Sequence, residues 1–322
     1  MLKKLNRIIC CSILTLILIF MFINIAFAEN FPTKTITIVV AGGVGGGTDV
    51  GARILASYME DYLGVNIIVQ NKPGGGQLVG TQSVYVAPKD GYTILCTSFV
   101  SEYVVEKNMN AEYSVDEFVG IGAANQDPLF IVEKTGTFGS IDNLIKVAQE
   151  RNILFSSTGL TGGDAYHVQR AADALGIRDK IRIVPYDSGS EELAALLGGH
   201  IDIQPRAGGY YDRHGTDVTI LAVASLERWP GLEDVPTLYE ITGKKIKLGH
   251  IRGLVVHKDV PKERIEVLRK AFAYAVEQDG IEEKFMNAGL GFGALIGEDL
   301  DNRRREIWSE LEEYRETWAV KD

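Results

Sequence analysis

The amino-acid sequence predicts an α/β protein built from two successive series of alternating strands and helices. Three observations lead to this prediction. Short apolar, β-branched segments alternate with segments of helical periodicity along the chain. Glycine-rich polar loops follow several of the apolar segments, and no internal repeat or low-complexity tract interrupts the alternation. Strands that alternate with helices form parallel sheets, whose carboxyl ends carry the loops that bind ligands.

The first series has a βαβαβ order. Residues 49–63 predict a helix, because apolar side chains recur on one face at helical spacing. Thr48 or Asp49 can cap the start of this helix, and Gly64 suits its end. The other segments of this series are strands at 35–40, 65–69 and 92–97 and a second helix at 77–86.

The second series begins near Leu129 and follows the same alternation. Beyond it, the segment GLVVHKDVP predicts one more strand, and helices follow from Pro261 onward. The late helix at 303–318 is strongly charged, so we expect it to present a solvated outer face. Within the second series we expect strands at 129–132, 153–157, 181–186, 200–205 and 218–224, with helices at 141–150, 164–175 and 190–197.

The N-terminal segment has the pattern of a secretory signal. The basic start MLKKLNR precedes an apolar run over residues 8–28, which ends in Ala26-Phe27-Ala28. A basic start, an apolar middle and an A-x-A end predict a signal peptide, residues 1–28, cleaved before Glu29. The alternative is an uncleaved membrane anchor, because about twenty apolar residues can span a bilayer. No cysteine ends the run, so we expect no lipid anchor there.

Length and charge limit the partners of the exported chain. The chain has 322 residues and a net charge of −10, so cleavage after residue 28 would leave 294 residues. The removed segment holds Lys3, Lys4, Arg7 and no acid, which leaves a net charge of −13. This length suggests two domains, and this charge argues against nucleic acid or an anionic membrane as partners. With Cys96 as its one cysteine, the mature chain can form no internal disulfide.

The loop between the first strand and the first helix, AGGVGGGTD, resembles an anion-binding turn. It lacks the lysine of a Walker A loop, and it also fails the dinucleotide pattern G-x-G-x-x-G. What remains is general: glycines allow close backbone approach, and a helix N-terminus presents free N–H groups to an anion. The alternative is a tight turn without a ligand, in which Asp49 caps the helix.

Six segments in register resemble the substrate-binding receptors of tripartite tricarboxylate transporters, also called Bug receptors. They are VVAGGVGGGTDVGARILASYM, VQNKPGGGQLVGTQSV, APKDGYTIL, VPYDSGSEELAALLGGHIDI, DVPTLYEITG and GLVVHKDVPKERIEVL. The resemblance covers essentially the whole mature chain. It implies a type II periplasmic-binding-protein fold and an exported receptor without enzymatic activity or cofactor. It also implies a small carboxylate held between two domains and delivered to the subunits of a membrane permease.

The resemblance also implies the domain boundaries and the pocket. Domain 1 would comprise residues 29–124 plus 248–322, domain 2 would comprise residues 125–247, and the receptor would act as a monomer. The C-terminal return to domain 1 would create a hinged cleft. The implied ligand-binding residues are Gly45, Gly46, Gly47, Thr48, Thr97, Ser98, Ser157, Thr158, Gly159, Thr161, Gly162, Tyr186 and Arg206.

Several positions depart from the family pattern or have an ordinary alternative. Ala41 and Gly42 replace a proline and an aromatic residue of the family loop, and Arg206 stands where the family has a smaller side chain. Arg206 can clamp a carboxylate or pair on the surface with Asp202 or Asp212. The segment before the helix histidine carries about two extra residues. That histidine, His167, is expected to be a packed, hydrogen-bonded residue rather than a ligand contact.

Other function classes stay open on the residues alone. The five histidines form no H-x-x-x-H or H-E-x-x-H pair and the mature chain has no C-x-x-C, so we expect no zinc site. There is no G-x-S-x-G elbow, but Ser157 and His167 could meet in space, which leaves an exported acyl-transfer hydrolase as a weak rival. A ligand-binding sensory module for a membrane kinase is a second alternative.

Overall fold

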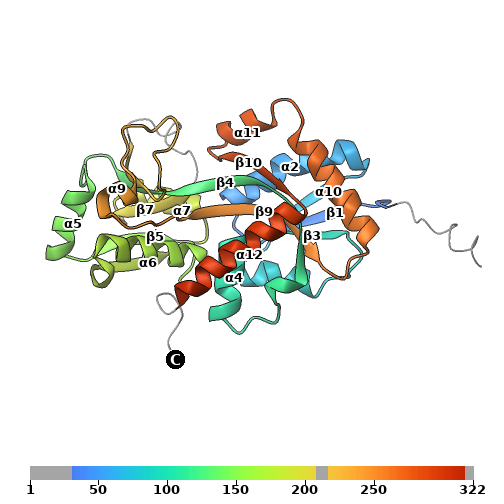
Figure 1. The fold of residues 1–322 in the computed structure, drawn as a ribbon, viewed down its shortest axis with the longest axis horizontal. Helices are drawn as coiled ribbons and strands as arrows, with labels where there is room; N and C mark the ends of the chain where they lie inside the picture. The colour runs from blue at the N-terminus through green and yellow to red at the C-terminus, as the bar shows by residue number, and fades with distance from the viewer. Residues whose placement is uncertain (1–30, 208–216, 316–322) are drawn as a thin grey trace, which may run out of the picture. The chain divides into compact units, whose positions relative to one another are not determined.

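Apolar segments of the chain form one ten-stranded sheet (Figure 1). The computed structural model describes residues 31–207 and 217–315. Strands lie in the order β2-β1-β3-β9-β4-β7-β5-β6, and β8 and β10 each pair with β4. The strands are β1 (Ile36–Val40), β2 (Ile67–Asn71), β3 (Thr93–Ser98), β4 (Phe118–Lys134), β5 (Ile153–Ser157), β6 (Ile181–Pro185), β7 (Ile203–Ala207), β8 (Val218–Val223), β9 (Gly249–His257) and β10 (Phe292–Ile296).

Helices connect the strands, as the alternation in the sequence predicts. The expected helices all form among the described residues, with ends shifted by up to five residues, and residues 316–318 of the expected last helix lie outside the described range. Short 3₁₀ turns occur at Gly75–Gln77, Val115–Glu117 and Arg178–Lys180. The α-helices are α2 (Gly47–Leu63), α3 (Leu78–Tyr85), α4 (Phe99–Asn108), α5 (Ile141–Glu150), α6 (Gly163–Leu175), α7 (Gly189–Leu197), α9 (Leu238–Thr242), α10 (Lys262–Val276), α11 (Ile281–Asn287) and α12 (Glu298–Glu313). No helix in this part of the chain is long and apolar enough to cross a membrane.

The two ends of the sheet are parallel and its middle is antiparallel. β1 pairs in parallel with β2 and β3, and β5 pairs in parallel with β6 and β7. Between these groups run β9 and the long strand β4, which pair antiparallel with each other and with the strands beside them. The βαβ alternation predicts the parallel groups, but it does not reveal the antiparallel strands between them.

The C-terminal segment packs on the N-terminal elements. β9 pairs with β3, α10 contacts α2, and α12 contacts α4 and β4. These contacts lie within one compact unit, Lys34–Asp322. Segments far apart in the sequence therefore share one core, in which Val39, Leu95 and Val255 are almost fully buried.

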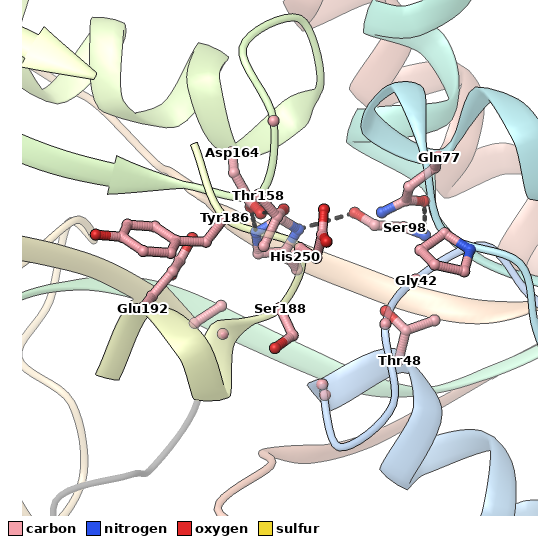
Figure 2. Close-up of a pocket in the computed structure, with 18 of the residues that line it drawn as sticks. Gly42, Thr48, Gln77, Ser98, Thr158, Asp164, Tyr186, Ser188, Glu192 and His250 are labelled. Atoms are coloured by element: carbon pink, nitrogen blue, oxygen red, sulfur yellow. Dashed lines mark hydrogen bonds and ion pairs between the residues drawn. The ribbon is translucent and has the colours of Figure 1, made fainter. Parts of the chain in front are cut away.

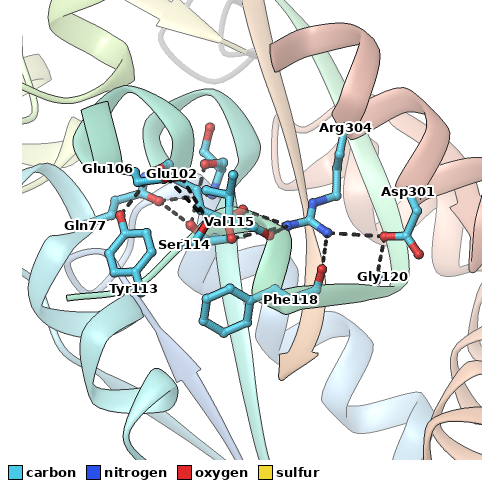
Figure 3. A network of polar contacts seen from close by, with 12 residues as sticks. Gln77, Glu102, Glu106, Tyr113, Ser114, Val115, Phe118, Gly120, Asp301 and Arg304 are labelled. Atoms are coloured by element: carbon cyan, nitrogen blue, oxygen red, sulfur yellow. Dashed lines mark hydrogen bonds and ion pairs between the residues drawn. The ribbon is translucent and has the colours of Figure 1, made fainter. Parts of the chain in front are cut away.

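Helix α12 has the solvated outer face that its charge suggested, and its opposite face is buried. Its Arg304 is only 1% exposed, and Ile307, Trp308 and Leu311 are also buried. Arg304 pairs with Glu102 of α4 at 3.3 Å and donates to the carbonyl of Phe118 at 2.9 Å (Figure 3). Burial raises the pKa of Glu102 to about 7 in spite of the neighbouring arginine. One face of the charged helix is thus part of the core.

Candidate ligand site

The loops at the carboxyl ends of the strands meet around a cavity of about 200 Å³ (Figure 2). Loops after β1 and β2 line one side, and loops after β5 and β6 line the other. This is the placement expected for ligand loops in an α/β sheet. The lining residues include Gly42, Gly45, Gly46, Gly47, Thr48, Gly76, Gln77, Ser98, Thr158, Gly159, Asp164, Tyr186, Ser188, Gly189, Glu192, Gln204, Arg206, His250 and Arg252.

The loop after β1 is held in place by Asp49. The backbone N–H of Gly45 donates to Asp49 Oδ2 at 2.9 Å, and Arg53 Nε donates to Oδ1 at 3.0 Å. The expected cap by Thr48 or Asp49 is wrong, because Gly46 occupies the N-cap position and no side chain caps the helix. Asp49 therefore orients the loop, and Gly47 and Thr48 of the first turn of α2, a part of a helix whose N–H groups have no partner within the helix, line the cavity.

The loop after β1 and the loop after β6 approach each other closely. A Cβ atom at Gly43 would lie 2.8 Å from the carbonyl oxygen of Asp187, so only glycine fits there. Ser190 Oγ donates to the carbonyl of Gly45 at 3.3 Å. The two sides of the cavity are therefore in direct contact at this rim.

A second glycine loop, after β2, lies beside the first. Gly74, Gly75, Gly76 and Gln77 all have positive φ, and Gln77 is the one non-glycine residue with this conformation among those described. The Oε1 atom of Gln77 accepts from Thr97 Oγ1 at 2.6 Å and from the N–H of Ser98 at 3.1 Å. These bonds fix the unusual backbone of Gln77 at the end of β3.

A histidine in contact with an aspartate lines the cavity. His250 Nε2 lies 2.6 Å from Asp164 Oδ1, and His250 Nδ1 lies 2.8 Å from Ser98 Oγ. Thr158 Oγ1 donates to the other carboxylate oxygen of Asp164. Burial alone would raise the pKa of Asp164, but His250 and the hydrogen bonds outweigh it and hold this pKa well below its usual value.

Two arginines and a buried acid complete the polar lining. Arg252 donates to Asp127 Oδ2 at 2.8 Å and to Asn125 Oδ1 at 2.6 Å. Arg206 donates to the carbonyl of Gly189 at 3.2 Å. Burial, and then the charge of Asp164, raises the pKa of Glu192, so its neutral form is favoured beside these cations.

Most of the expected site residues come together in this cavity. Four do not line it: Thr97 is buried under Gln77, Ser157 donates to the carbonyl of Gly159, Thr161 contacts Met109, and Gly162 packs on Gly76. The nine that line it are Gly45, Gly46, Gly47, Thr48, Ser98, Thr158, Gly159, Tyr186 and Arg206.

Arg206 lines the cavity, and one of the two surface partners considered for it, Asp202, pairs with another arginine. Asp202 pairs with Arg151 at 2.7 Å, and Asp212 lies outside the described residues. His167 is buried and does not line the cavity, so the expected packing is confirmed, but the expected hydrogen bonding fails at Nδ1, which has no partner. Its ring meets the His250 ring edge-on, with the ring centroids 4.6 Å apart. The hydroxyl that contacts a histidine is that of Ser98, not the suggested Ser157.

The sequence did not reveal the site residues that come together only through contacts between remote segments. Asp164, Glu192 and His250 were not among the expected site residues, and no site residue was expected in the loop at Gly74–Gln77. One signal was available for that loop, because three consecutive glycines after a strand repeat the pattern of the loop after β1.

Known proteins resemble the chain in sequence and in fold. A family model described as tripartite tricarboxylate transporter family receptor matches residues 51–300. A UPF0065 protein from the tcbD-tcbE intergenic region of a Pseudomonas species is 30% identical over 300 residues, 89% of this chain and 88% of that protein.

Solved structures show the same fold. The periplasmic binding protein BugD superimposes with a TM-score of 0.81 at 26% identity, over 91% of this chain and 100% of that one. An adipate-bound protein of R. palustris gives 0.79 at 20% identity, over 89% and 98% of the chains. The malate-bound MatC of Rhodopseudomonas palustris gives 0.78 at 21% identity, over 88% and 99%.

The family match confirms the expected fold and the expected class of protein. The fold is the mixed α/β fold of periplasmic binding proteins, and the class is a binding protein rather than an enzyme. The chain belongs to the tripartite tricarboxylate transporter family of solute-binding receptors.

Proposed function

We propose that this receptor captures a small carboxylate in the cavity and presents it to the permease subunits of a tripartite transporter. The observation that carries the proposal is the set of donors around one small cavity. The N-terminus of α2 and the glycine loops face it from one side, and Arg206 faces it from the other. N–H groups at a helix N-terminus favour an anion, and an arginine fork matches a carboxylate.

The cavity contains acids as well as donors, yet it suits an anion. Both carboxylate oxygens of Asp164 already have partners, since one contacts His250 Nε2 and the other accepts from Thr158. The raised pKa of Glu192 favours its neutral form. The net charge of −13 for the mature chain opposes an anion at long range, so these local donors must supply the affinity.

We further propose that the ligand closes a cleft between two domains, residues 29–124 plus 248–322 and residues 125–247. Loops from both segments line the cavity, and β4 and β9 run between them. A ligand that contacts both sides binds the closed form better and shifts the population toward it. The receptor acts as a monomer in this scheme.

We propose that a cleaved signal, residues 1–28, carries the receptor out of the cytoplasm. This segment lies outside the described residues.

Adipate and malate, which occupy two structures of the same fold, are both dicarboxylates. We therefore place dicarboxylates first among the ligands to test.

A thermal-shift screen tests the proposal. Malate, adipate and other dicarboxylates should each be compared with the uncharged diamide of the same carbon chain. A binding acid at about 100 times its dissociation constant adds about 2.7 kcal/mol to the free energy of unfolding. We expect at least one acid to raise the melting temperature while its diamide does not. If no carboxylate raises it, or if diamides do so equally, the cavity is not a carboxylate site.

A further inference from the structure

Three side chains with metal-binding atoms meet between the ligand cavity and a second cavity of about 480 Å³. Asp164 and His250 line the first cavity, and His167 and His250 line the second. The candidate ligand atoms of Asp164, His167 and His250 all lie within 4.8 Å of one another. His250 thus belongs to the wall that separates the two cavities.

The backbone brings these three residues together from two elements. Asp164 and His167 are three residues apart on α6, so their side chains share one face of the helix. His250 comes from β9 and places Nε2 2.6 Å from Asp164 Oδ1. The two imidazole rings stand at 86° with centroids 4.6 Å apart, an arrangement compatible with two rings directed at one ion.

One atom of the cluster has no partner that would compensate for its burial. His167 is 1% exposed and its Nδ1 atom has no hydrogen-bond partner, so it is an uncompensated polar atom in the core. A metal ion would satisfy such an atom, because the nitrogen of a neutral imidazole is a common metal ligand.

We propose that Asp164, His167 and His250 bind a divalent transition-metal ion of the zinc class. Two imidazoles and one carboxylate suit zinc and its neighbours, whereas magnesium and calcium prefer oxygen ligands. Ser98 on His250 Nδ1 and Thr158 on Asp164 already act as second-sphere partners that orient the ligands. An ion can enter from the ligand cavity, which Asp164 and His250 line.

Binding of a zinc ion requires the ligand atoms of the cluster to move closer together. Zinc–ligand bonds of about 2.0–2.2 Å place tetrahedral ligand atoms roughly 3.5 Å apart. The separations of up to 4.8 Å therefore shrink by side-chain rotation as the ion enters. Three protein ligands leave a fourth position open toward the cavity. If the proposed function is right, a carboxylate of the captured solute can fill it.

A zinc titration of tag-free protein, first treated with EDTA and then dialysed, tests this site. We expect calorimetry to give one equivalent of bound Zn²⁺, with no response to Mg²⁺ at the same concentration. His167→Gln and Asp164→Asn should each weaken Zn²⁺ binding by about 100-fold or more, beyond the effect of losing a second-sphere group. His200→Gln, a substitution of an exposed histidine away from the cluster, should leave binding unchanged.

Two further measurements keep the test decisive. Circular dichroism and melting in EDTA establish that each variant folds. Co²⁺ added to the wild-type protein should give the visible absorption of a low-coordinate site, which needs no variant. The proposal is overturned if the wild type binds no Zn²⁺ saturably, or if folded His167→Gln and Asp164→Asn bind it as tightly as the wild type. No carboxylate is present in these titrations, so their failure leaves the proposed ligand site standing.

Discussion

Removal of the buried Arg304 side chain should strongly destabilise the fold. Arg304 and Glu102 are 1% and 0% exposed, so neither charge is screened by water. The guanidinium also donates to the carbonyls of Phe118 at 2.9 Å and Val115 at 3.3 Å, and to Asp301 Oδ1 at 3.2 Å (Figure 3). Arg304→Met keeps most of the side-chain volume and removes the guanidinium, so all of these hydrogen bonds are lost while their partners remain in place.

The size of the stability loss follows from the unpaired Glu102 carboxylate that the substitution leaves in the core. Breaking a buried ion pair by removing one partner costs about 3–5 kcal/mol. The loss should depend on pH, because burial raises the pKa of Glu102 to about 7 from the usual 4.5. Stability from a raised carboxyl pKa is fully present below 4.5 and is lost as pH rises through 7. This shift corresponds to about 3 kcal/mol above pH 7, and Arg304→Met should raise the pKa further.

Urea unfolding at pH 5.5 and pH 8 measures both effects. We expect Arg304→Met to lose about 3–5 kcal/mol at pH 8 and less at pH 5.5, where Glu102 is protonated. The double variant Glu102→Gln/Arg304→Met should recover part of the loss at pH 8, because no buried charge remains. Arg305→Met, at an exposed position, should change stability by less than about 0.5 kcal/mol. A loss below about 1 kcal/mol for Arg304→Met at pH 8 would refute the reasoning.

Three further predictions concern the ligand and export. Gly46→Val should keep the fold, since φ there is −72°, but should weaken carboxylate binding by about 100-fold, because its side chain would keep the ligand from one or two charge-assisted bonds to the N–H groups that follow. If calorimetry shows wild-type affinity at an unchanged melting temperature, the loop is only a turn. Arg206→Ala should cost about 2–5 kcal/mol of binding if the guanidinium pairs with a desolvated carboxylate, and unchanged affinity in the same titration would reject that pairing. N-terminal sequencing of the exported protein should begin at Glu29, whereas a start at Met1 in the membrane fraction would favour an anchor.

The local alternation of the sequence was enough to predict most of the fold. The helix at Ile141–Glu150 and the strand at Ile153–Ser157 were predicted to the residue, because apolar periodicity and turn residues bound them. The length of β4 was not predictable, since its antiparallel partners β7, β8 and β9 are remote in sequence. The buried face of α12 was not predicted for the same reason, because Glu102, the partner that buries Arg304, is remote in sequence.

Some residues of the candidate site were predictable from the sequence and others were not, again according to whether their signal is local. The loop residues Gly45 to Thr48 were accessible to sequence reasoning because glycines between a strand and a helix have a local signature. Asp164 and His250 were not, because they are 86 positions apart and meet only through the pairing of β9 inside the sheet. The absence of H-x-x-x-H spacing excludes only a local metal motif, which is why an Asp-His-His cluster could still assemble.

A crystal structure of the receptor with the tightest-binding dicarboxylate tests the central claim most directly. The account predicts one ligand carboxylate within hydrogen-bond distance of the N–H groups at Gly47 and Thr48, with Arg206 facing the same ligand from the opposite side of the cavity. Ligand density outside this cavity, or a ligand inside it whose carboxylates avoid the α2 N-terminus, would contradict the account.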